Sequence, residues 1–308
     1  MALLEFFKGK GPSGFGYGST AEEVTKGLDL SGRTFLVTGS NSGLGFETVR
    51  VLALRGARVI AAARTAEKAR AACAGLGREI IPVACELSDP AAVRACVEAV
   101  KAGAPALDAI ICNAGIMGLP RLEQAHGYES QFFTNHIGHF ILTTGLIDRL
   151  ADGGRVVVVS SGAHNAAPKE GIEFDNLSGE RSYGPWRAYG QSKLANLLFA
   201  KELARRLRLA GARKTANAVH PGVILATNLS RNIPPPLMFV ARSASSLFTK
   251  TVEQGAATQC FVATHPSLET VSGAYFADCN VAQSSALSHD AALAERLWVE
   301  SERIVAKL

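Results

Sequence analysis

The residues best suited to chemistry lie in one short stretch, Tyr189-Gly190-Gln191-Ser192-Lys193. Tyr189 and Lys193 are four positions apart within residues 187–209, a run of helical character, so both side chains are expected on one helical face. A phenol has a pKa of about 10 in water, and a neighbouring ammonium group lowers it by stabilising the phenolate. Such a pair could transfer a proton near neutral pH, although an ordinary surface Tyr and Lys would have the same spacing.

The elements that position this pair alternate along the chain between short apolar runs and helical segments. We predict strands over residues 34–38, 58–63, 80–84, 107–112, 155–160 and 215–219, and helices over 43–55, 66–75, 89–101, 129–150 and 187–209. Asp89 is expected to cap the helix that it begins, ahead of Pro90. Further on we predict a helix over 251–264, an edge strand over 273–277 and a final helix over 291–306. The strands are continuously apolar, which is typical of strands covered on both faces. The pattern therefore predicts an α/β fold with one doubly wound parallel sheet and helices on both faces.

The chain divides into an N-terminal extension, residues 1–30, and a single catalytic domain, residues 31–308. The extension is glycine-rich over 11–18, and its Ser19-Thr20 pair offers a capping box with Glu22 or Glu23. After the sixth strand, residues 223–250 are apolar and stiffened by Pro234-Pro235-Pro236. We expect this segment to form a lid over a substrate.

Composition excludes several classes of partner. The 32 basic and 27 acidic residues give a net charge of +5 without a basic stripe, so no nucleic acid partner is expected. No uncharged apolar run approaches the roughly 18 residues that span a bilayer, so no integral membrane segment is expected. The six cysteines contain no C-x-x-C pair and lie in apolar segments, which indicates reduced thiols and a cytoplasmic protein.

A glycine-rich turn joins the first predicted strand to the first predicted helix. Glycines at such a turn let the main chain approach a pyrophosphate, whose charge then faces the helix N-terminus. The predicted contacts are Gly39, Ser40, Asn41, Ser42, Gly43, Leu44 and Gly45. The end of the second strand reads Arg64-Thr65 with no acidic residue, which favours a ribose 2′-phosphate over a free 2′-hydroxyl and so NADP(H) over NAD(H).

These features together resemble the short-chain dehydrogenase/reductase family. The glycine spacing, Asn113-Ala114-Gly115, Asn135, a serine at the end of the fifth strand, Tyr189 with Lys193, and Pro221-Gly222 follow the family's order over about residues 33–280. The wording of residues 192–196 and 220–222 is most similar to the retinol-dehydrogenase-like branch. The resemblance implies a Rossmann-type sheet.

The resemblance also implies a division of roles. Tyr189 would be the general acid and base, Lys193 would lower its pKa and hold the nicotinamide ribose, and Asn135 would order a water behind Lys193. Ser161 would bind the substrate oxygen, because strand alternation sends Ser160 to the other side. The remaining cofactor contacts would be Glu86, Leu87, Asn113, Ala114, Gly115, Pro221, Gly222, Val223 and Thr227. Glu86 departs from the aspartate that the family usually has there, which weakens its assignment to the adenine.

We therefore expect an NADP(H)-dependent oxidoreductase that interconverts a hydrophobic ketone or aldehyde and its alcohol. The long interval before Tyr189 holds Phe174, Asn176, Leu177, Tyr183 and Trp186, which indicates a roomy apolar pocket. A light-dependent pigment reductase of the protochlorophyllide type and a non-catalytic NADPH-sensing or scaffold protein are the alternatives.

No metal site is expected. His136 and His139 are three positions apart, but no third ligand is suitably spaced. A homodimer or homotetramer is expected by resemblance, and the sequence does not choose between them.

Overall fold

The computed structural model describes residues 9–76, 79–224 and 249–308. Most of the predicted lid, and Thr227 with it, lies outside the described residues. Within them, one large sheet has the strand order β10-β9-β8-β7-β4-β1-β2-β3. The strands are β1 (Thr34–Thr38), β2 (Arg58–Ala63), β3 (Ile80–Ala84), β4 (Leu107–Cys112), β7 (Leu150–Val159), β8 (Thr215–His220), β9 (Tyr275–Ala277) and β10 (Asn280–Val281). A separate small hairpin pairs β5 (Gln124–Ala125) with β6 (Tyr128–Glu129).

Alternate residues of each strand enter different hydrophobic cores. In β1, Leu36 belongs to one core, whereas Phe35 and Val37 belong to the other. In β7, Val156 and Val158 face the first core, and Val157 and Val159 face the second. Because both faces of the sheet are covered, apolar residues are needed on both faces of a central strand.

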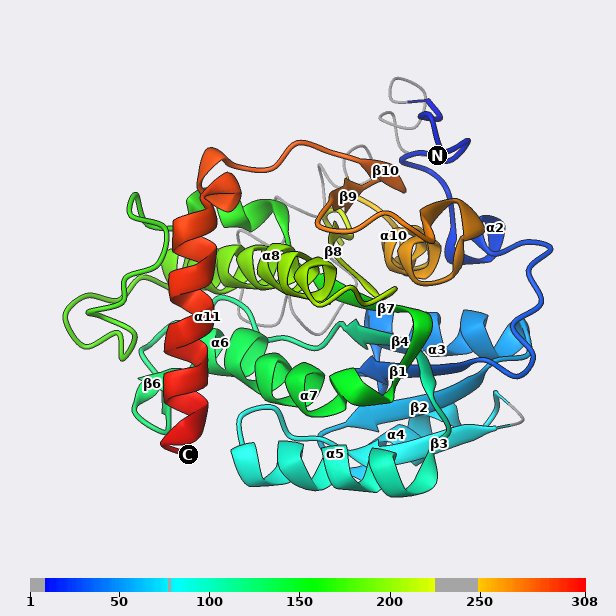
Figure 1. The fold of residues 1–308 in the computed structure, drawn as a ribbon, viewed down its shortest axis with the longest axis horizontal. Coiled ribbons are helices and arrows are strands. Elements are labelled where there is room, and N and C mark those ends of the chain that lie inside the picture. The colour runs from blue at the N-terminus through cyan, green and yellow to red at the C-terminus, as the bar shows by residue number, and fades with distance from the viewer. Residues whose placement is uncertain (1–8, 77–78, 225–248) are drawn as a thin grey trace.

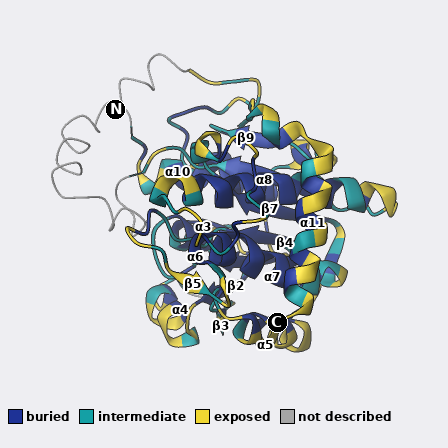
Figure 2. Ribbon diagram, turned by 90° about the vertical axis from the view of Figure 1, so that its left-hand side faces the viewer, coloured by how far each residue is buried: buried dark blue, intermediate teal, exposed yellow. Residues whose placement is uncertain are grey.

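Two helical layers supply these cores (Figure 1). The first core lies under α5 (Pro90–Gly103), α6 (Ser130–Phe132), α7 (Gly138–Leu146), α8 (Pro185–Leu209) and α11 (Ala291–Ala306). The second lies under α2 (Ala21–Val24), α3 (Gly43–Leu54), α4 (Ala66–Cys73) and α10 (Val252–Thr264). Figure 2 shows the dark blue strands and inner helical surfaces enclosed by helices whose outer surfaces are exposed. Among the described helices, none combines the length and apolar character needed to cross a bilayer.

Local signals placed several helix ends where the sequence predicts them. Thr20 and Glu23 form the complete capping box of α2. The Asp89 side chain accepts a hydrogen bond from the Ala91 amide at the start of α5. Each cap satisfies an amide that the first helical turn leaves without a partner.

Three predictions about these elements are wrong. The helix expected over residues 129–150 is interrupted by a π-helical turn, Phe133–Ile137, and its last residue, Leu150, already begins β7. Strand β7 starts before the predicted Arg155, because its pairing with β4 continues across an irregularity to Leu107 and Leu150. Strand β9 is not at the edge of the sheet, since β10 pairs with it antiparallel. Apolar periodicity carries no signature of a π turn or of an irregular strand start.

The described part of the N-terminal extension is fastened to the C-terminal hairpin. Asn280 accepts a hydrogen bond from the Ser13 amide at 3.0 Å and donates to the Phe15 carbonyl at 3.0 Å. Gln254, at the start of α10, donates to the Gly18 carbonyl at 3.3 Å. The extension therefore packs on the edge of the sheet that carries β9 and β10.

Candidate functional site

The turn between β1 and α3 is shaped to receive an anion. Gly39 and Gly43 have φ values of 69° and 54°, which favour glycine. A Cβ on Gly45 would lie 2.2 Å from the Gly39 carbonyl oxygen, so only glycine allows α3 to start this close to the turn. Ser42 makes no side-chain cap hydrogen bond, and the first turn of α3 contains no acidic residue. The first amides of α3 are therefore available to a pyrophosphate.

Thr38 joins this turn to the end of β4. Its hydroxyl accepts hydrogen bonds from the amides of Asn113 at 2.9 Å and Ala114 at 3.0 Å. Asn113 Nδ2 also donates to the Thr38 carbonyl at 2.9 Å. The predicted cofactor segment 113–115 is thereby held against the glycine turn.

His139 completes this connection. Its Nδ1 lies 2.9 Å from the Asn135 carbonyl, which can only accept, so Nδ1 carries the proton. Nε2 then accepts from the Thr38 hydroxyl at 2.8 Å. Burial lowers the pKa of His139 to about 4, which keeps this neutral tautomer. Sequence reasoning considered His139 as a metal ligand, rejected that role, and missed this link to Thr38.

Tyr189 and Lys193 lie near the start of α8, beside the carboxyl end of β7. The Lys193 ammonium donates to the Val159 carbonyl at 3.0 Å and lies 5.7 Å from the centre of the Tyr189 ring. Ser160 donates to the Lys193 carbonyl at 2.7 Å and so faces α8, while the Ser161 hydroxyl lies close enough to the Tyr189 phenol to lower its pKa. The structure therefore brings Ser161, rather than Ser160, to the tyrosine hydroxyl.

Burial dominates the acid–base properties of the pair. It raises the pKa of Tyr189 to about 12, and the hydrogen bond from Ser161 opposes this rise. Burial also lowers the pKa of Lys193 to about 8. The sequence predicted a lowered pKa for Tyr189, and in the protein alone the direction is the opposite, because the cost of burying a phenolate exceeds the stabilisation available to it.

Asn135 sits in the π turn, and its amide is fully engaged. Its Oδ1 accepts from the Ile116 amide at 2.8 Å, and its Nδ2 donates to the Ile116 carbonyl at 3.0 Å and to Ser192 Oγ at 2.9 Å. A Cβ on Gly115 would lie 3.0 Å from Asn135 Oδ1 and 3.6 Å from the Lys193 nitrogen. Asn135, Gly115 and Lys193 therefore meet at one point, which the sequence predicted only by resemblance.

Only part of the predicted apolar pocket is open. Trp186 is 49% exposed and meets the Tyr189 ring edge-on, with the ring centres 6.4 Å apart. Asn176 and Leu177 are buried, and Tyr183 donates to the Leu119 carbonyl at 2.6 Å. Phe174 is half-buried and is covered by the Arg296 guanidinium at 3.9 Å from the ring centre. Asn176 and Leu177 therefore belong to the packed interior, and the apolar pocket expected for this interval stays a prediction.

The predicted adenine end is more open. Arg64 is exposed, and Thr65 caps α4 by accepting from the Lys68 amide at 3.3 Å. Glu86 Oε1 accepts from the Ser88 amide at 3.2 Å and from the Ser88 hydroxyl at 2.9 Å. Leu87 is buried against Gly138, where a Cβ would lie 2.4 Å from the Leu87 carbonyl oxygen.

Lys250 packs against the turn that follows β8. Its amide donates to the Val223 carbonyl at 2.9 Å, and its buried ammonium pairs with Asp278 at 2.6 Å and lies 4.8 Å from the Tyr17 ring centre. A Cβ on Gly222 (φ 90°) would lie 2.7 Å from the Lys250 chain. Sequence reasoning missed Lys250, because its partners lie far away along the chain and no local pattern pairs them.

The remaining histidines and cysteines have structural surroundings. Within the described ranges, no group of three or more His, Cys, Asp or Glu side chains could hold a metal ion. His164 is buried and links the Ser161 carbonyl, at 2.6 Å, to the Ser285 amide, at 3.1 Å. All six cysteines are buried and unpaired, and burial raises the pKa of Cys112 to about 12.

Comparison with known proteins gives a consistent family. A sequence profile described as short chain dehydrogenase matches residues 33–237. The chain is 42% identical to the short-chain dehydrogenase TIC 32 A, chloroplastic, of Brassica napus, with 100% of both chains covered. It is 37% identical to human retinol dehydrogenase 14, over 94% of this chain and 92% of the relative.

A solved structure adds a likeness in three dimensions. A short chain dehydrogenase from Burkholderia cenocepacia J2315, in complex with NADP, superposes with a TM-score of 0.65 at 27% identity. The match covers 80% of this chain and 96% of that one.

Proposed function

Because this chain belongs to the short-chain dehydrogenase/reductase family, in its retinol-dehydrogenase-like branch, we propose that it interconverts a hydrophobic ketone or aldehyde and the corresponding alcohol. The chain is an NADP-dependent dehydrogenase or reductase. The finer assignment rests on one observation, the buried Tyr189 phenol with the Ser161 hydroxyl and the Lys193 ammonium beside it.

The described residues fit NADP(H). The open amides of α3 and the turn at Gly39 and Gly43 suit its pyrophosphate. Arg64 is exposed at the end of β2, where it would pair with the ribose 2′-phosphate. The cofactor would supply or accept the hydride, and the protein the orientation and the proton.

We infer the following proton path. In reduction, the Tyr189 hydroxyl donates its proton to the carbonyl oxygen of the substrate, and in oxidation the phenolate removes it from the alcohol. The Ser161 hydroxyl donates a hydrogen bond to the same oxygen and stabilises the developing alkoxide. Lys193 stabilises the phenolate. Asn135 fixes the surroundings of Lys193 through its hydrogen bonds to the Ile116 carbonyl and to Ser192 Oγ.

The surroundings of Tyr189 support an apolar substrate. The exposed Trp186 indole lies against the Tyr189 ring, and Gly118 packs at contact distance from it, since a Cβ there would lie 3.8 Å from the indole. Exposed large apolar groups beside a catalytic group are typical of a hydrophobic binding site.

The decisive experiment is turnover of a panel of hydrophobic ketones with NADPH, in the dark, by the wild type and by Tyr189→Phe. We expect kcat of the variant to fall by roughly 10³-fold, the range of general acid–base catalysis, with NADPH binding retained. Tyr128→Phe is the matched control, because Tyr128 stacks on Phe133 away from Lys193.

Wild-type rates in Tyr189→Phe would refute the proton path. NADPH binding without turnover of any ketone, aldehyde or alcohol would instead favour the sensing or scaffold alternative. Turnover that requires both light and a pigment would favour the pigment reductase.

A further inference from the structure

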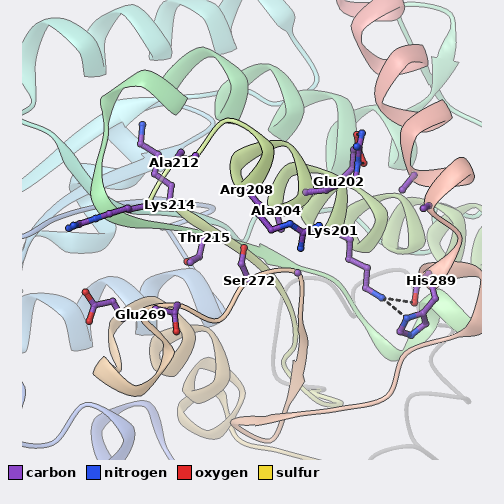
Figure 3. Close-up of a pocket in the computed structure, with 18 of the residues that line it drawn as sticks. Lys201, Glu202, Ala204, Arg208, Ala212, Lys214, Thr215, Glu269, Ser272 and His289 are labelled. Carbon is purple, nitrogen blue, oxygen red and sulfur yellow. Dashed lines mark hydrogen bonds and ion pairs between the residues drawn. The ribbon is translucent and has the colours of Figure 1, made fainter.

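A charged groove lies near the start of strand β8, whereas part of the proposed cofactor site follows the end of the same strand. It is lined by the second half of α8, the amino end of β8, residues 269–273 and the start of α11, and it has a volume of about 920 Å³ (Figure 3). Thr215 begins β8 and lines the groove, whereas Pro221 and Gly222 follow the other end of the strand. Six strand residues separate the two sites by about 20 Å.

The basic residues of the groove outnumber its acidic residues. Five basic side chains line it, namely Lys201, Arg205, Arg208, Arg213 and Lys214, against the acidic Glu202, Glu269 and Asp290. Glu202 is buried and already paired with Arg205 and Arg206, each at 2.7 Å. Asp290 caps α11 by accepting from the Leu293 amide. Five basic side chains against three acidic ones leave the groove with a net positive charge.

Lys201 shows this imbalance most clearly. Its side chain is half-buried, and its partners in the described chain are neutral, Ser288 Oγ at 3.4 Å and His289 Nδ1 at 3.3 Å (Figure 3). Burial without a carboxylate partner lowers the pKa of this lysine. An anion in the groove would supply the missing countercharge.

Two further cations have no carboxylate within ion-pair distance in the described structure. Lys214 donates to the Ile147 carbonyl at 2.8 Å, and Arg208 is exposed on the last turn of α8. Arg213 lies 3.7 Å from Asp152, but both side chains are more than three-quarters exposed, so this pair is weak.

A buried hydroxyl in the lining also lacks a partner. Thr215 is 5% exposed, and its Oγ1 makes no hydrogen bond to any described residue. Buried polar groups in folded proteins are nearly always satisfied, so this orphan is unusual, but the oxygen is itself buried and is not an open contact for a ligand in the groove. Ser272 beside it accepts from the Ala216 amide at 3.1 Å and keeps its own proton free to donate.

We propose that this groove binds a compound carrying two or more phosphate groups, at a site separate from the cofactor site. Several lysine and arginine side chains spread along the walls match several phosphates better than one carboxylate. No aromatic residue other than His289 lines the groove in the described structure, so the recognition requires no stacked base. Phosphates of this kind occur in soluble polyphosphate compounds and in lipid headgroups, and the 70% exposed Leu209 beside Arg208 is compatible with either source.

The test titrates inorganic tripolyphosphate into the full chain saturated with NADPH, so that the glycine turn is occupied, at about physiological salt. We expect one site by calorimetry, and Lys201→Gln/Arg208→Gln should raise its Kd at least about 10-fold. Lys26→Gln/Lys101→Gln removes the same charge from exposed positions outside the groove and should leave Kd unchanged. Melting temperature and kcat should be the same in both variants.

A second arm identifies the source of the phosphate. The protein is sedimented with cardiolipin vesicles. Co-sedimentation that is lost in Lys201→Gln/Arg208→Gln and is reduced by competing tripolyphosphate would support the site, with a lipid headgroup as the ligand. Tripolyphosphate binding without vesicle binding would support it with a soluble ligand. Absence of both, or binding that falls no more in the groove variant than in the control, overturns the proposal. Because the readout is phosphate binding, failure of the proposed reaction would leave this test intact.

Discussion

The proposed cofactor site has two ends that differ in burial. At the catalytic end lie Lys193, Asn135 and Ser192, which are all buried. Each of them makes a hydrogen bond to another of the three or to the main chain. At the adenine end, Arg64 and Thr65 are exposed, and Glu86 bonds only its own turn. Proton transfer needs groups held in one geometry before the substrate arrives, whereas selection of a phosphate needs an accessible charge. Rigid burial at one end and exposure at the other therefore suit the two different tasks that we propose for these residues.

The largest effect is expected from Lys193→Met, which tests the buried end. We expect kcat to fall by roughly 10²–10⁴-fold, because the phenolate of Tyr189 loses the cation beside it. The folded pKa of Lys193, about 8, lies below its ordinary value of 10.5. Between these values the unfolded chain binds more protons, so stability rises with pH, and the cost of burying the charge is complete below pH 8.

Removing that charge should therefore stabilise the inactive protein. We expect the free energy of unfolding of Lys193→Met to exceed that of the wild type by about 1–3 kcal/mol at pH 7. The difference should shrink by pH 10, as followed by urea denaturation. A variant that is destabilised equally at both pH values would contradict this. It would show that the hydrogen bond from Lys193 to the Val159 carbonyl stabilises the fold more than burial of the charge destabilises it.

Next in size is Arg64→Gln, which tests the exposed end. Loss of a hydrogen bond to a charged phosphate costs about 1.5–3 kcal/mol, so KM for NADPH should rise about 10- to 100-fold. KM for NADH, kcat and the melting temperature should not change. Arg70→Gln, an exposed arginine on the following helix, is the control. Equal losses for both cofactors would mean that Arg64 does not read the 2′-phosphate.

The helix that carries Asn135 should be sensitive to acid. Ser301 donates to the Leu297 carbonyl and so accepts from His136 Nε2, which leaves the buried Nδ1 unprotonated and without a partner in the described chain. Burial lowers the pKa of His136 from 6.5 to about 3. Between these values the unfolded chain binds more protons, so this contribution to stability is lost as pH falls below 6.5, by up to about 1.4 kcal/mol per pH unit.

In His136→Phe, the free energy of unfolding should depend less steeply on pH, because one fewer proton is taken up on unfolding. The measurement is the free energy of unfolding between pH 6.5 and 4. The exposed His126 gives the control, His126→Asn, for which an unchanged slope is expected. An unchanged slope in His136→Phe would assign the acid sensitivity to other groups, such as His139.

The smallest effect is expected from Glu86→Gln. The glutamate is half-exposed and already bonded to Ser88, so KM for NADPH should change by less than about 3-fold. A change above 10-fold would show that Glu86 binds the adenine strongly, and it would weaken the contrast between the two ends.

The sequence by itself determined the parallel sheet and most element bounds. Strands β1 to β4 and the helix Ala291–Ala306 lie where the apolar pattern predicts them, and Thr20 and Asp89 cap the predicted helices. These features depend on side chains a few positions apart, so a short stretch of sequence is enough to predict them. The i, i+4 spacing of Tyr189 and Lys193 belongs to the same class.

Only the tertiary structure decided how the site is held. The π turn at Asn135, the link from His139 to Thr38 and the pair between Lys250 and Asp278 join residues far apart in sequence. Burial also set the direction of the Tyr189 pKa, which the lysine alone would have lowered. Desolvation and long-range hydrogen bonds depend on which surfaces pack together, and no local pattern specifies that.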